Sequence, residues 1–536
     1  MSQAGFQILS RRLDADPNAM SLFQACEPLS DSEHRLLLES SEAGSNGKQQ
    51  SILFLESALI LEARGFEVTV MAKTENGQQA LDVLSATLNA QQTSEISVQV
   101  ISNELLKISY LDSRILAEEE LRKKRLTSLD AVRKVLSVLA TGSGMDAEKL
   151  IAAGVVGYDY VNVLEQLPDM PTTEEDFPDY ILLIADSQIM LDKQSKRAEI
   201  RQIIFNGPNA ERIKGRARGR IAKLEAIIKS TKGAFKLPDN RQVDIDFDKI
   251  AAQPSRDDFK DQIGQLKEAI DEGRIFQAVV SRKFSLDCDN PELAYQVLTQ
   301  QNPSPYQFYL RLGKYTLFGA SPESSLRFDS KSRTISIMPI AGTRGRGRNP
   351  DGSINLELDS RLEVDLKLDE KELAEHLMLV DLARNDLARI AVTGSRHVSE
   401  LMAIYRYASV MHMVSRVDAQ LADDLDVYHA CQSCFHMGTL SGAPKAEAMA
   451  LISEIEKKPR GAYGGAVGYF TAAGDMDTAI VIRSALMQAD KAVITAGAGV
   501  VYDSDPDMEV QETELKASSV IRAIQVAKQL AQGPGE

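Results

Sequence analysis

Three charged side chains near the C-terminal end could take part in binding a divalent metal ion. Glu509, Glu512 and Lys516 stand at positions i, i+3 and i+7, a spacing that places side chains on one face of a helix. Two carboxylates this close repel each other unless a cation lies between them, and carboxylates together with water are ligands that suit Mg²⁺. The alternative interpretation is a solvated charged face of an ordinary helix.

A second pair of acidic residues has the same spacing. Glu372 and Glu375 stand at i and i+3 after Asp369, which can cap the N-terminus of a helix, and apolar residues with helical periodicity follow. Two helices that face each other with such pairs could hold a metal ion that keeps most of its water ligands. Each pair alone is better explained by a surface helix, so the metal hypothesis needs both helices and ligand-binding loops beside them.

Loops of this kind follow several β-strand-like segments in the C-terminal half. Turns dense in Gly, Pro and Ser accompany the segments 303–312, 315–325 and 335–347. Turns of this composition present backbone groups and small side chains to a ligand. The segment 438–456 predicts a loop that enters a helix near Pro444, whose free N–H groups could bind an anion. Arg483 lies in an apolar segment, where an arginine requires an anionic partner.

Other motifs lack a residue that would define a cofactor site. The Gly-Ala-Gly step at 497–499 has neither the third glycine nor the following helix of a dinucleotide fingerprint. Lys445 has no Gly-x-x-x-x-Gly before it, which excludes a P-loop. Cys431 and Cys434 lack the second pair that a zinc site needs, and we interpret them as buried thiols on one helix face. A lone histidine in an apolar strand, such as His412, is more often a core residue than a catalyst.

Composition limits the partners that this chain can have. Its 536 residues are enough for two domains or one elaborate sandwich. Lys and Arg number 61 against 77 acidic residues, a net charge of −16, which speaks against nucleic acid or an anionic membrane as a partner. No apolar stretch is long enough to cross a membrane, and the first residues lack the order of a signal peptide. A cytoplasmic protein without a nucleic-acid or membrane partner is predicted.

The elements that must position these residues predict an α+β fold. Apolar alternation over 51–72 indicates a β-hairpin, and the segment 209–232 indicates a basic amphipathic helix. The polar segment 233–243 that follows is the predicted boundary between an N-terminal α+β domain at 1–240 and a C-terminal catalytic domain at 241–536. We expect large antiparallel β-sheets packed as an α/β sandwich with flanking helices.

Taken together, the motifs resemble those of the chorismate-utilising enzymes, and within that family the branch that forms anthranilate. The motifs that carry the resemblance occur in family order and are PSPY, FGASPESSL, PIAGTR, AEHLMLVDLARNDLARI, Y-x-x-V-M-H, GTLSGAPK, YGGAVGYF, IVIRSA and AGAGVV. The resemblance covers roughly residues 20 to 525. It implies a Mg²⁺-dependent lyase that adds ammonia to C2 of chorismate as the C4 hydroxyl leaves, and then eliminates pyruvate to give anthranilate. This is the first step of tryptophan biosynthesis.

The resemblance also implies a metal site and a substrate site. Glu375 and Glu512 would be Mg²⁺ ligands, and Glu372 and Glu509 would reach the ion directly or through water. The ion would hold the ring carboxylate and act as a Lewis acid. The residues implied to bind the two carboxylates of chorismate are Gly342, Thr343, Thr439, Tyr463, Arg483, Gly497, Ala498, Gly499 and Lys516.

Three further residues are implied to serve the chemistry. Glu323 would be the general acid for the departing hydroxyl, and His412 would serve the elimination. Gln277 stands where water-using members of the family have a lysine, and Ala341 stands where aminodeoxychorismate synthases have one. Without a basic residue to activate water or to attack C2, ammonia is the nucleophile left. No glutaminase motif is present, so a separate glutamine amidotransferase subunit should supply it, in a heterotetramer of two large and two small subunits.

A feedback site for L-tryptophan is implied between the two halves of the chain. Its residues would be Glu39, Ser40, Pro305, Tyr306, Gln307, Phe308, Val467, Gly468 and Tyr469. Bound tryptophan would favour an arrangement of the halves that closes chorismate out, with a coupling of about 1–3 kcal/mol. Gln307 and Gln50 stand where relatives often have methionine and lysine, which leaves the strength of inhibition open.

Three other functions stay open at this point. An amine-forming chorismate enzyme could stop at a nonaromatic amine and release no pyruvate. A non-catalytic tryptophan-binding regulator is a second possibility, although all the polar residues of the implied site are present. Nucleotide binding through the Gly-rich loops is a third, and it predicts protection by ATP or NAD in a melting assay.

Overall fold

The computed structural model describes residues 4–30, 33–40, 49–112, 114, 124–168, 173–231, 233, 235–237, 243–407 and 410–532. The strands of the N-terminal half are β1 (Phe6–Asp14), β2 (His34–Ser40), β3 (Gln50–Arg64), β4 (Glu67–Ala72), β5 (Ile96–Ser102), β6 (Leu105–Tyr110), β7 (Ile151–Val156), β8 (Tyr180–Asp192) and β9 (Arg197–Phe205). The later strands are β10 (Ala251–Gln253), β11 (Gln277–Asp287), β12 (Tyr306–Leu312), β13 (Tyr315–Ser321), β14 (Ser324–Asp329), β15 (Thr334–Ile337), β16 (Ile340–Gly345), β17 (His397–Arg406), β18 (Val410–Gln420), β19 (Gly442–Ala443), β20 (Ala466–Thr471), β21 (Met476–Ile480), β22 (Ser484–Gln488) and β23 (Lys491–Val500). The α-helices are α1 (Ala19–Ala25), α2 (Glu75–Asn89), α4 (Asp130–Leu139), α5 (Val161–Leu164), α6 (Ala210–Ser230), α7 (Arg256–Asp271), α8 (Pro291–Gln301), α9 (Leu356–Leu368), α10 (Glu370–Ala388), α11 (Val427–Cys434), α12 (Lys445–Glu456) and α13 (Pro506–Ala531).

Two long strands, β3 and β8, belong to two sheets and join them. The first part of β3 pairs with β2 and with the end of β8, whereas its last part pairs with β4 and with the start of β8. The register between β3 and β8 shifts between Phe54 and Leu59. Bulges bend a strand, and they occur where strands pass from one sheet of a sandwich to the other.

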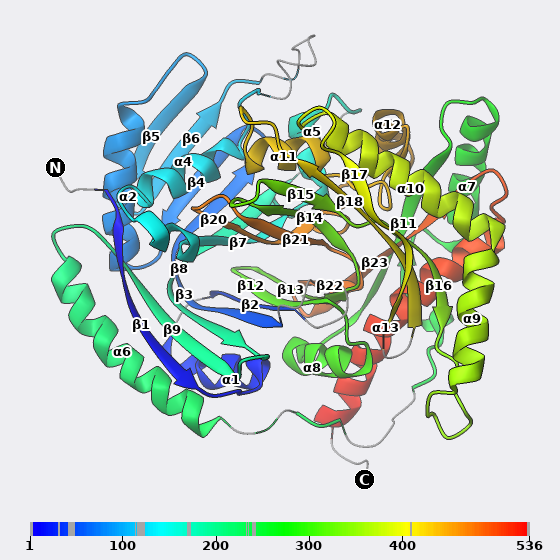
Figure 1. The fold of residues 1–536 in the computed structure, drawn as a ribbon, viewed down its shortest axis with the longest axis horizontal. Helices are drawn as coiled ribbons and strands as arrows, with labels where there is room; N and C mark the ends of the chain where they lie inside the picture. Colours follow the sequence, from blue (N-terminus) through cyan, green and yellow to red (C-terminus); the bar gives the residue numbers. More distant parts are fainter. Residues whose placement is uncertain are drawn as a thin grey trace.

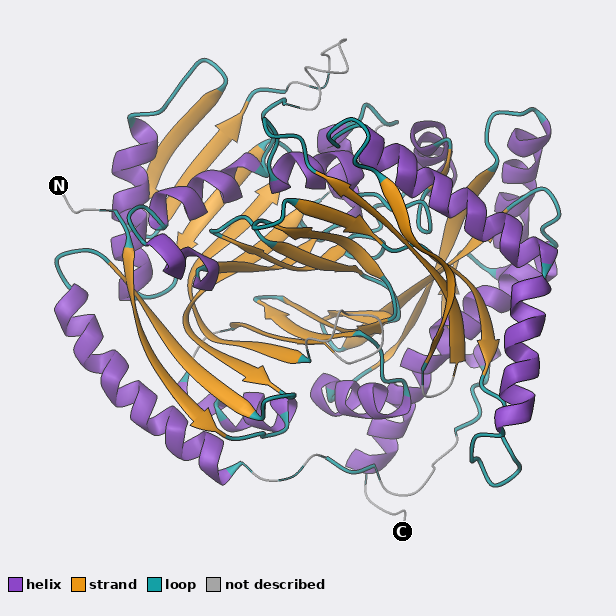
Figure 2. Ribbon diagram, viewed as in Figure 1, coloured by secondary structure: helices purple, strands orange, loops and turns teal. Residues whose placement is uncertain are grey.

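Each sheet extends away from this corner through antiparallel pairings. One sheet runs β7–β20–β21–β14–β15–β18, with β16 and β17 also paired to β18. The other runs β2–β12–β13–β22–β23–β11, with β10 and β19 also paired to β11. Figures 1 and 2 show the two sheets facing each other with helices on the outside. The predicted α+β sandwich is therefore confirmed.

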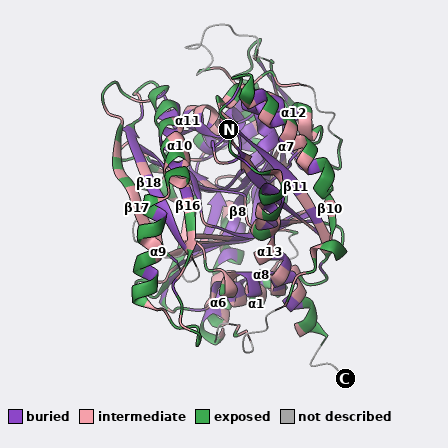
Figure 3. Ribbon diagram, turned by 90° about the vertical axis from the view of Figure 1, so that its right-hand side faces the viewer, coloured by how far each residue is buried: buried purple, intermediate pink, exposed green. Residues whose placement is uncertain are grey.

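The apolar core lies between the sheets and beneath the outer helices. Phe54, Leu183 and Phe308 belong to a buried cluster between the two sheets. A second cluster packs α13, through residues such as Val520 and Ile524, against α8 and the sheet that contains β23. Figure 3 shows buried strands inside and exposed outer faces on the helices. Both faces of each sheet are therefore covered. This packing holds the helices that carry candidate site residues in place against the sheets.

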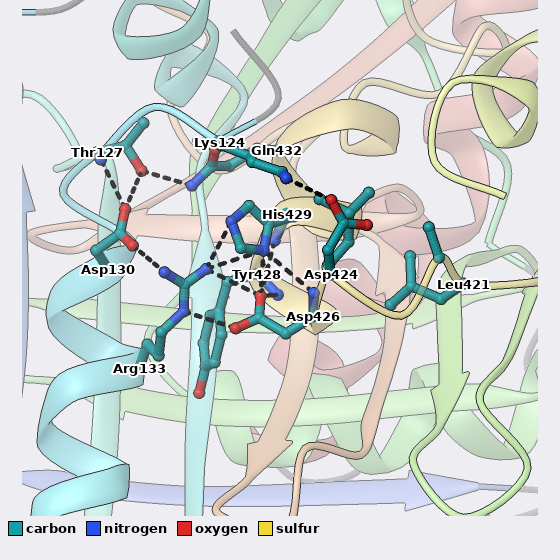
Figure 4. A network of polar contacts seen from close by, with 12 residues as sticks. Lys124, Thr127, Asp130, Arg133, Leu421, Asp424, Asp426, Tyr428, His429 and Gln432 are labelled. Carbon is teal, nitrogen blue, oxygen red and sulfur yellow. Dashed lines mark hydrogen bonds and ion pairs between the residues drawn. The ribbon is translucent and has the colours of Figure 1, made fainter. Parts of the chain in front are cut away.

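The two halves of the chain share both sheets and are also joined at the surface. β2 pairs with β12, and β7 pairs with β20. Arg133 of α4 forms an ion pair of 2.7 Å with Asp426, the N-cap residue of α11 (Figure 4). Residues 238–242 at the expected boundary lie outside the described residues. The division into domains 1–240 and 241–536 stays a prediction, and any such domains would be joined by continuous hydrogen-bonded sheets.

The helices that carry the two acidic pairs begin at side-chain caps. The Asp369 carboxylate accepts hydrogen bonds from the backbone N–H groups of Lys371 and Glu372 at the start of α10. Asp505 accepts a hydrogen bond from the N–H of Met508 at the start of α13. A cap of this kind stabilises a helix by about 1 kcal/mol. None of the helices in the described ranges is long and apolar enough to cross a membrane.

Candidate active site

Acidic and basic side chains of α10 and α13 lie within electrostatic range of each other, although the helices are far apart in the chain. Glu375 on α10 lies within electrostatic range of Lys516 and Glu512 on α13. Lys516 Nζ lies 2.5 Å from Glu512 Oε1 and donates a hydrogen bond of 3.0 Å to the carbonyl oxygen of Gly497 on β23. The structure therefore brings the two predicted acidic pairs toward the same centre.

Glu509 is the most buried of the four glutamates, with 4% of its surface exposed. Its Oε2 atom has no hydrogen-bond partner among the described residues. Desolvation raises the pKa of Glu509 to about 7, and the neighbouring Glu512 adds to this rise. Burial acts to raise the pKa of Glu512 too, but Lys516, the hydrogen bond with Glu509 and the charge of Lys371 together outweigh it, so the pKa is lowered. A buried carboxylate oxygen without a partner is a position that a cation would stabilise.

The donor set of this centre fits Mg²⁺, which prefers oxygen ligands and keeps several waters. Among the described residues, no three His, Cys, Asp or Glu side chains already form a group that could hold a metal ion. The pKa of Glu375 is raised by desolvation, which a divalent ion would reverse. The oxygen donors of this centre therefore suit a divalent ion that keeps most of its water ligands.

Two glycines of β23 form an open strand surface beside this centre. β23 pairs with β11 so that Gly497 lies opposite Ser281 and Gly499 opposite Val279. A Cβ on Gly497 would stand 2.7 Å from the hydroxyl oxygen of Tyr463, and one on Gly499 would stand 2.7 Å from Gln277 Nε2. Distances under 3 Å are too short for a side-chain carbon, so the two polar side chains can lie here only because the strand has none.

We expect Gly497→Ala to raise the KM for chorismate, the substrate that the sequence resemblance implies, about tenfold, because the added methyl group must displace Tyr463 and overpacking of this kind costs about 1–3 kcal/mol. Steady-state kinetics measures the change. Gly345→Ala is the matched control on β16, since a Cβ there meets nothing within 4 Å. An unchanged KM in the Gly497 variant would contradict the placement of the substrate over this strand.

Glu323 lies where the chain passes from β13 in one sheet to β14 in the other. Its side chain is 7% exposed, and desolvation raises its pKa to about 8, although the charges of Lys516 and Arg483 oppose the rise. It lines a small cavity together with Thr439, whose hydroxyl group is buried beside Glu323 and also opposes the rise of its pKa. Glu323 is thus protonated at neutral pH and can donate a proton to a bound ligand.

His412 is both a buried strand residue and a member of the polar site. On β18 it faces Thr343 of β16, and the Thr343 hydroxyl lies 2.8 Å from His412 Nδ1. Desolvation and the charge of Arg483 lower the pKa of His412 to about 4, so the ring is neutral at pH 7. Arg483 itself has a left-handed backbone, with φ of 51°, and desolvation lowers its pKa. A left-handed conformation is uncommon in a non-glycine residue.

Two site residues escaped the prediction from sequence. Arg344 lies directly after Thr343, and its Nη1 contacts Glu372 Oε1 at 2.9 Å. Lys371 acts electrostatically on Glu375, Glu509 and Glu512. The signal for Arg344 was its position in the turn that also holds Gly342 and Thr343. Nothing in the residue pattern around Lys371 distinguishes it from a solvated helix residue.

A separate cavity of about 360 Å³ lies between the two sheets. Its lining includes the predicted inhibitor-site residues Glu39, Ser40, Tyr306, Gln307, Phe308, Val467, Gly468 and Tyr469. The remaining predicted residue, Pro305, is buried directly before β12. Arg327 and Asp477 also line the cavity, and the Tyr306 hydroxyl donates a hydrogen bond of 3.1 Å to Asp477. A cavity of this size, with both acidic and basic side chains on its wall, suits an amino acid.

Comparisons with known proteins agree with this geometry. The family described as chorismate binding enzyme matches residues 65–522. The anthranilate synthase component 1 of Escherichia coli (strain K12) is 45% identical over 492 residues, which cover 92% of this chain and 92% of that protein. The component 1 of Salmonella typhimurium is 44% identical over 511 residues, or 95% of each chain.

Solved structures show the same fold. The crystal structure of anthranilate synthase component I from Streptococcus pneumoniae TIGR4 matches with a TM-score of 0.65 and 27% identity, over 90% of this chain and 94% of that one. The isochorismate synthase MenF from Escherichia coli matches with a TM-score of 0.62 over 98% of this chain and 96% of that one. At 17% identity, this second likeness speaks for the fold alone.

Proposed function

Because the chain belongs to the chorismate-binding enzyme family, we propose that it is a lyase that converts chorismate and ammonia into anthranilate and pyruvate, the first step of tryptophan biosynthesis. Relatives similar over nearly their whole length are named anthranilate synthase component 1. The observation that carries the proposal is the approach of Glu375 on α10 to Glu512 and Lys516 on α13, beside the open strand at Gly497. Carboxylates for a metal ion and cations for a dicarboxylate substrate are then in one place.

In this proposal Glu375 and Glu512 hold Mg²⁺, with Glu372 and Glu509 next to them. Bound Mg²⁺ would hold the ring carboxylate of chorismate and withdraw electron density from the ring as a Lewis acid. Gly342, Thr343, Thr439, Tyr463, Arg483, Gly497, Ala498, Gly499 and Lys516 form the proposed surface for the two carboxylates of the substrate. The cations among them supply the local positive charge that a chain of net charge −16 otherwise lacks.

Two residues of the site would move protons. Glu323 is protonated at neutral pH, since its pKa is about 8, and would give its proton to the C4 hydroxyl as the C–O bond breaks and water leaves. His412 is neutral, since its pKa is about 4, and would accept the ring proton whose loss restores aromaticity as pyruvate is eliminated. A positioned acid or base of this kind typically contributes about 10²- to 10⁴-fold in rate.

Gln277 supports ammonia as the nucleophile. Its side chain is buried beside Gly499, and its Oε1 atom has no hydrogen-bond partner among the described residues. An unpaired amide oxygen can accept a hydrogen bond from ammonia, but it cannot remove a proton from water. The name component 1 of the relatives implies a second component, and we propose a glutamine amidotransferase subunit as the source of ammonia, in a heterotetramer of two copies of each chain.

We also propose that L-tryptophan binds in the cavity between the sheets and inhibits the reaction. The cavity lies between β2 and β12 on one side and β20 and β21 on the other. The turn that precedes β20 contains Tyr463 of the substrate surface. A ligand that shifts β20 would therefore change the position of this turn, which is a physical route for coupling the two sites.

Ser40→Leu is expected to weaken inhibition by tryptophan at least tenfold while turnover changes less than twofold. Ser40 lines the cavity, so a larger apolar side chain there takes space from the ligand, and Ser40 is not part of the proposed metal or substrate site. Inhibition curves at fixed chorismate measure the effect. Ser10→Leu makes the same change at an exposed position of β1 and should leave inhibition unchanged. Equal inhibition in wild type and Ser40→Leu would exclude this cavity as the tryptophan site.

One experiment tests the proposed function directly. The purified chain is mixed with chorismate, Mg²⁺ and ammonium, and anthranilate fluorescence and pyruvate are followed with and without tryptophan. We expect both products at equal rates and less of both with tryptophan. A nonaromatic amine without pyruvate would indicate a related amine-forming enzyme, and tryptophan binding without turnover would indicate a regulator. Protection by ATP or NAD in a melting assay would favour a nucleotide site instead.

A further inference from the structure

Arg344 joins three carboxylates at the edge of the candidate metal centre. Its guanidinium Nε lies 2.9 Å from Asp365 Oδ2, its Nη2 lies 2.7 Å from Asp369 Oδ2, and its Nη1 lies 2.9 Å from Glu372 Oε1. The Arg344 side chain is 22% exposed. One planar group thus links β16 to the end of α9 and to the first turn of α10.

These contacts fix the part of α10 that carries the acidic pair. Asp369 is bound to Arg344 and also caps α10, through the N–H groups of Lys371 and Glu372. The two carboxylate oxygens of Glu372 have different neighbours. Oε1 takes the guanidinium, while Oε2 points to the position where a Cβ on Gly342 would stand, 3.3 Å away. Gly342 belongs to the proposed substrate surface, so the second oxygen faces the site.

We propose that Arg344 is a positioning residue for the divalent metal ion. By holding Asp369 and Glu372, it sets the rotation and position of α10, so that Glu375, one turn further on, faces Glu512 of α13. The inference rests on the proposed metal-dependent function. Residues that orient metal ligands in this way typically change metal affinity or activity by about 10- to 100-fold when they are replaced.

An electrostatic role and a positioning role of Arg344 predict opposite effects on the affinity for the metal ion. A guanidinium close to a metal centre repels the ion, so a purely electrostatic role would make metal binding tighter when the charge is removed. A positioning role depends instead on the planar fork, which a lysine cannot replace even though it keeps the charge. Arg344→Lys therefore isolates the geometric contribution.

The test measures Mn²⁺ binding to the full chain by electron paramagnetic resonance of the free ion, with Mn²⁺ standing in for Mg²⁺. We expect Arg344→Lys to raise the Kd for Mn²⁺ about tenfold or more, and to raise the KM for Mg²⁺ more than it lowers kcat at saturating Mg²⁺. Amide exchange in the first turn of α10 should become faster. Arg346→Lys is the matched control directly after the same strand, because Arg346 pairs with Asp359 of α9 rather than with α10. It should stay within twofold of wild type.

A second variant covers the case in which Arg344→Lys does not fold. Asp369→Asn keeps a residue that caps helices well but removes the charge that holds Arg344, and it should also weaken Mn²⁺ binding several-fold. If either folded variant binds Mn²⁺ as tightly as wild type or more tightly, the inference about Arg344 is wrong. In that case the proposed function still holds as long as the wild type forms anthranilate. A wild-type chain that neither binds Mn²⁺ nor forms anthranilate would overturn both.

Discussion

Glu512→Ala is expected to lower kcat/KM for chorismate at least about 1,000-fold and to leave tryptophan binding in the cavity intact. Glu512 is the carboxylate of α13 that is closest to Lys516 and is electrostatically coupled to Glu375 of α10. Its loss would remove a proposed metal ligand and free Lys516 from its ion pair. A Lewis-acid metal supplies several kcal/mol of transition-state stabilisation, and about 4 kcal/mol corresponds to 1,000-fold in rate. Anthranilate fluorescence at saturating Mg²⁺ measures the loss, and calorimetry measures tryptophan binding.

The control for this variant removes a carboxylate from the same helix without touching the site. Asp507 pairs with Lys260 at the surface, and its side chain is 70% exposed. Surface pairs of this kind contribute about 0–1 kcal/mol, so Asp507→Ala should retain nearly full turnover. Wild-type turnover in Glu512→Ala would contradict the metal assignment, and joint loss of turnover and tryptophan binding would indicate unfolding rather than a site effect.

Local residue patterns predicted individual helices and strands better than the way in which these elements pack together. Asp369 caps α10, as its position before a helical apolar stripe predicts, and the basic helix expected over 209–232 is α6 (Ala210–Ser230). The corner of the sandwich was not predictable in the same way. It depends on register shifts in β3 between Phe54 and Leu59. Glu56 and Ser57 interrupt the apolar run there, but two polar residues in a strand do not by themselves show that pairing changes from one sheet to the other.

In the candidate site, too, the spacing of residues along a helix was predictable, whereas their contact partners were not. Spacing predicted which glutamates share a helix face, but the partner of each is set by packing. Glu372 is held by Arg344, which is 28 residues away in the chain. Lys445, at the predicted anion-binding helix start, is instead paired with Asp386 at 2.6 Å. Cys431 and Cys434 are buried free thiols on α11, as predicted, because a helical apolar stripe alone determines that outcome.

Glu323→Gln is expected to lower kcat about 10²- to 10⁴-fold and to remove a pH dependence that the wild type shows. Glu323 can act as an acid only while it is protonated. Desolvation raises its pKa to about 8, so the protonated fraction is high at pH 7 and falls as the pH rises through 8. Wild-type kcat should therefore decline on the alkaline side, whereas glutamine, which does not titrate, should give a low and flat profile there. The measurement holds the concentration of free ammonia constant at each pH, because the protonation of ammonia changes over the same range.

Glu447→Gln makes the same substitution in a surface pair with Arg274 and should keep the wild-type profile. An alkaline decline that persists in Glu323→Gln would assign the titration to another group, and Glu323 would then have no part in proton transfer to the leaving hydroxyl.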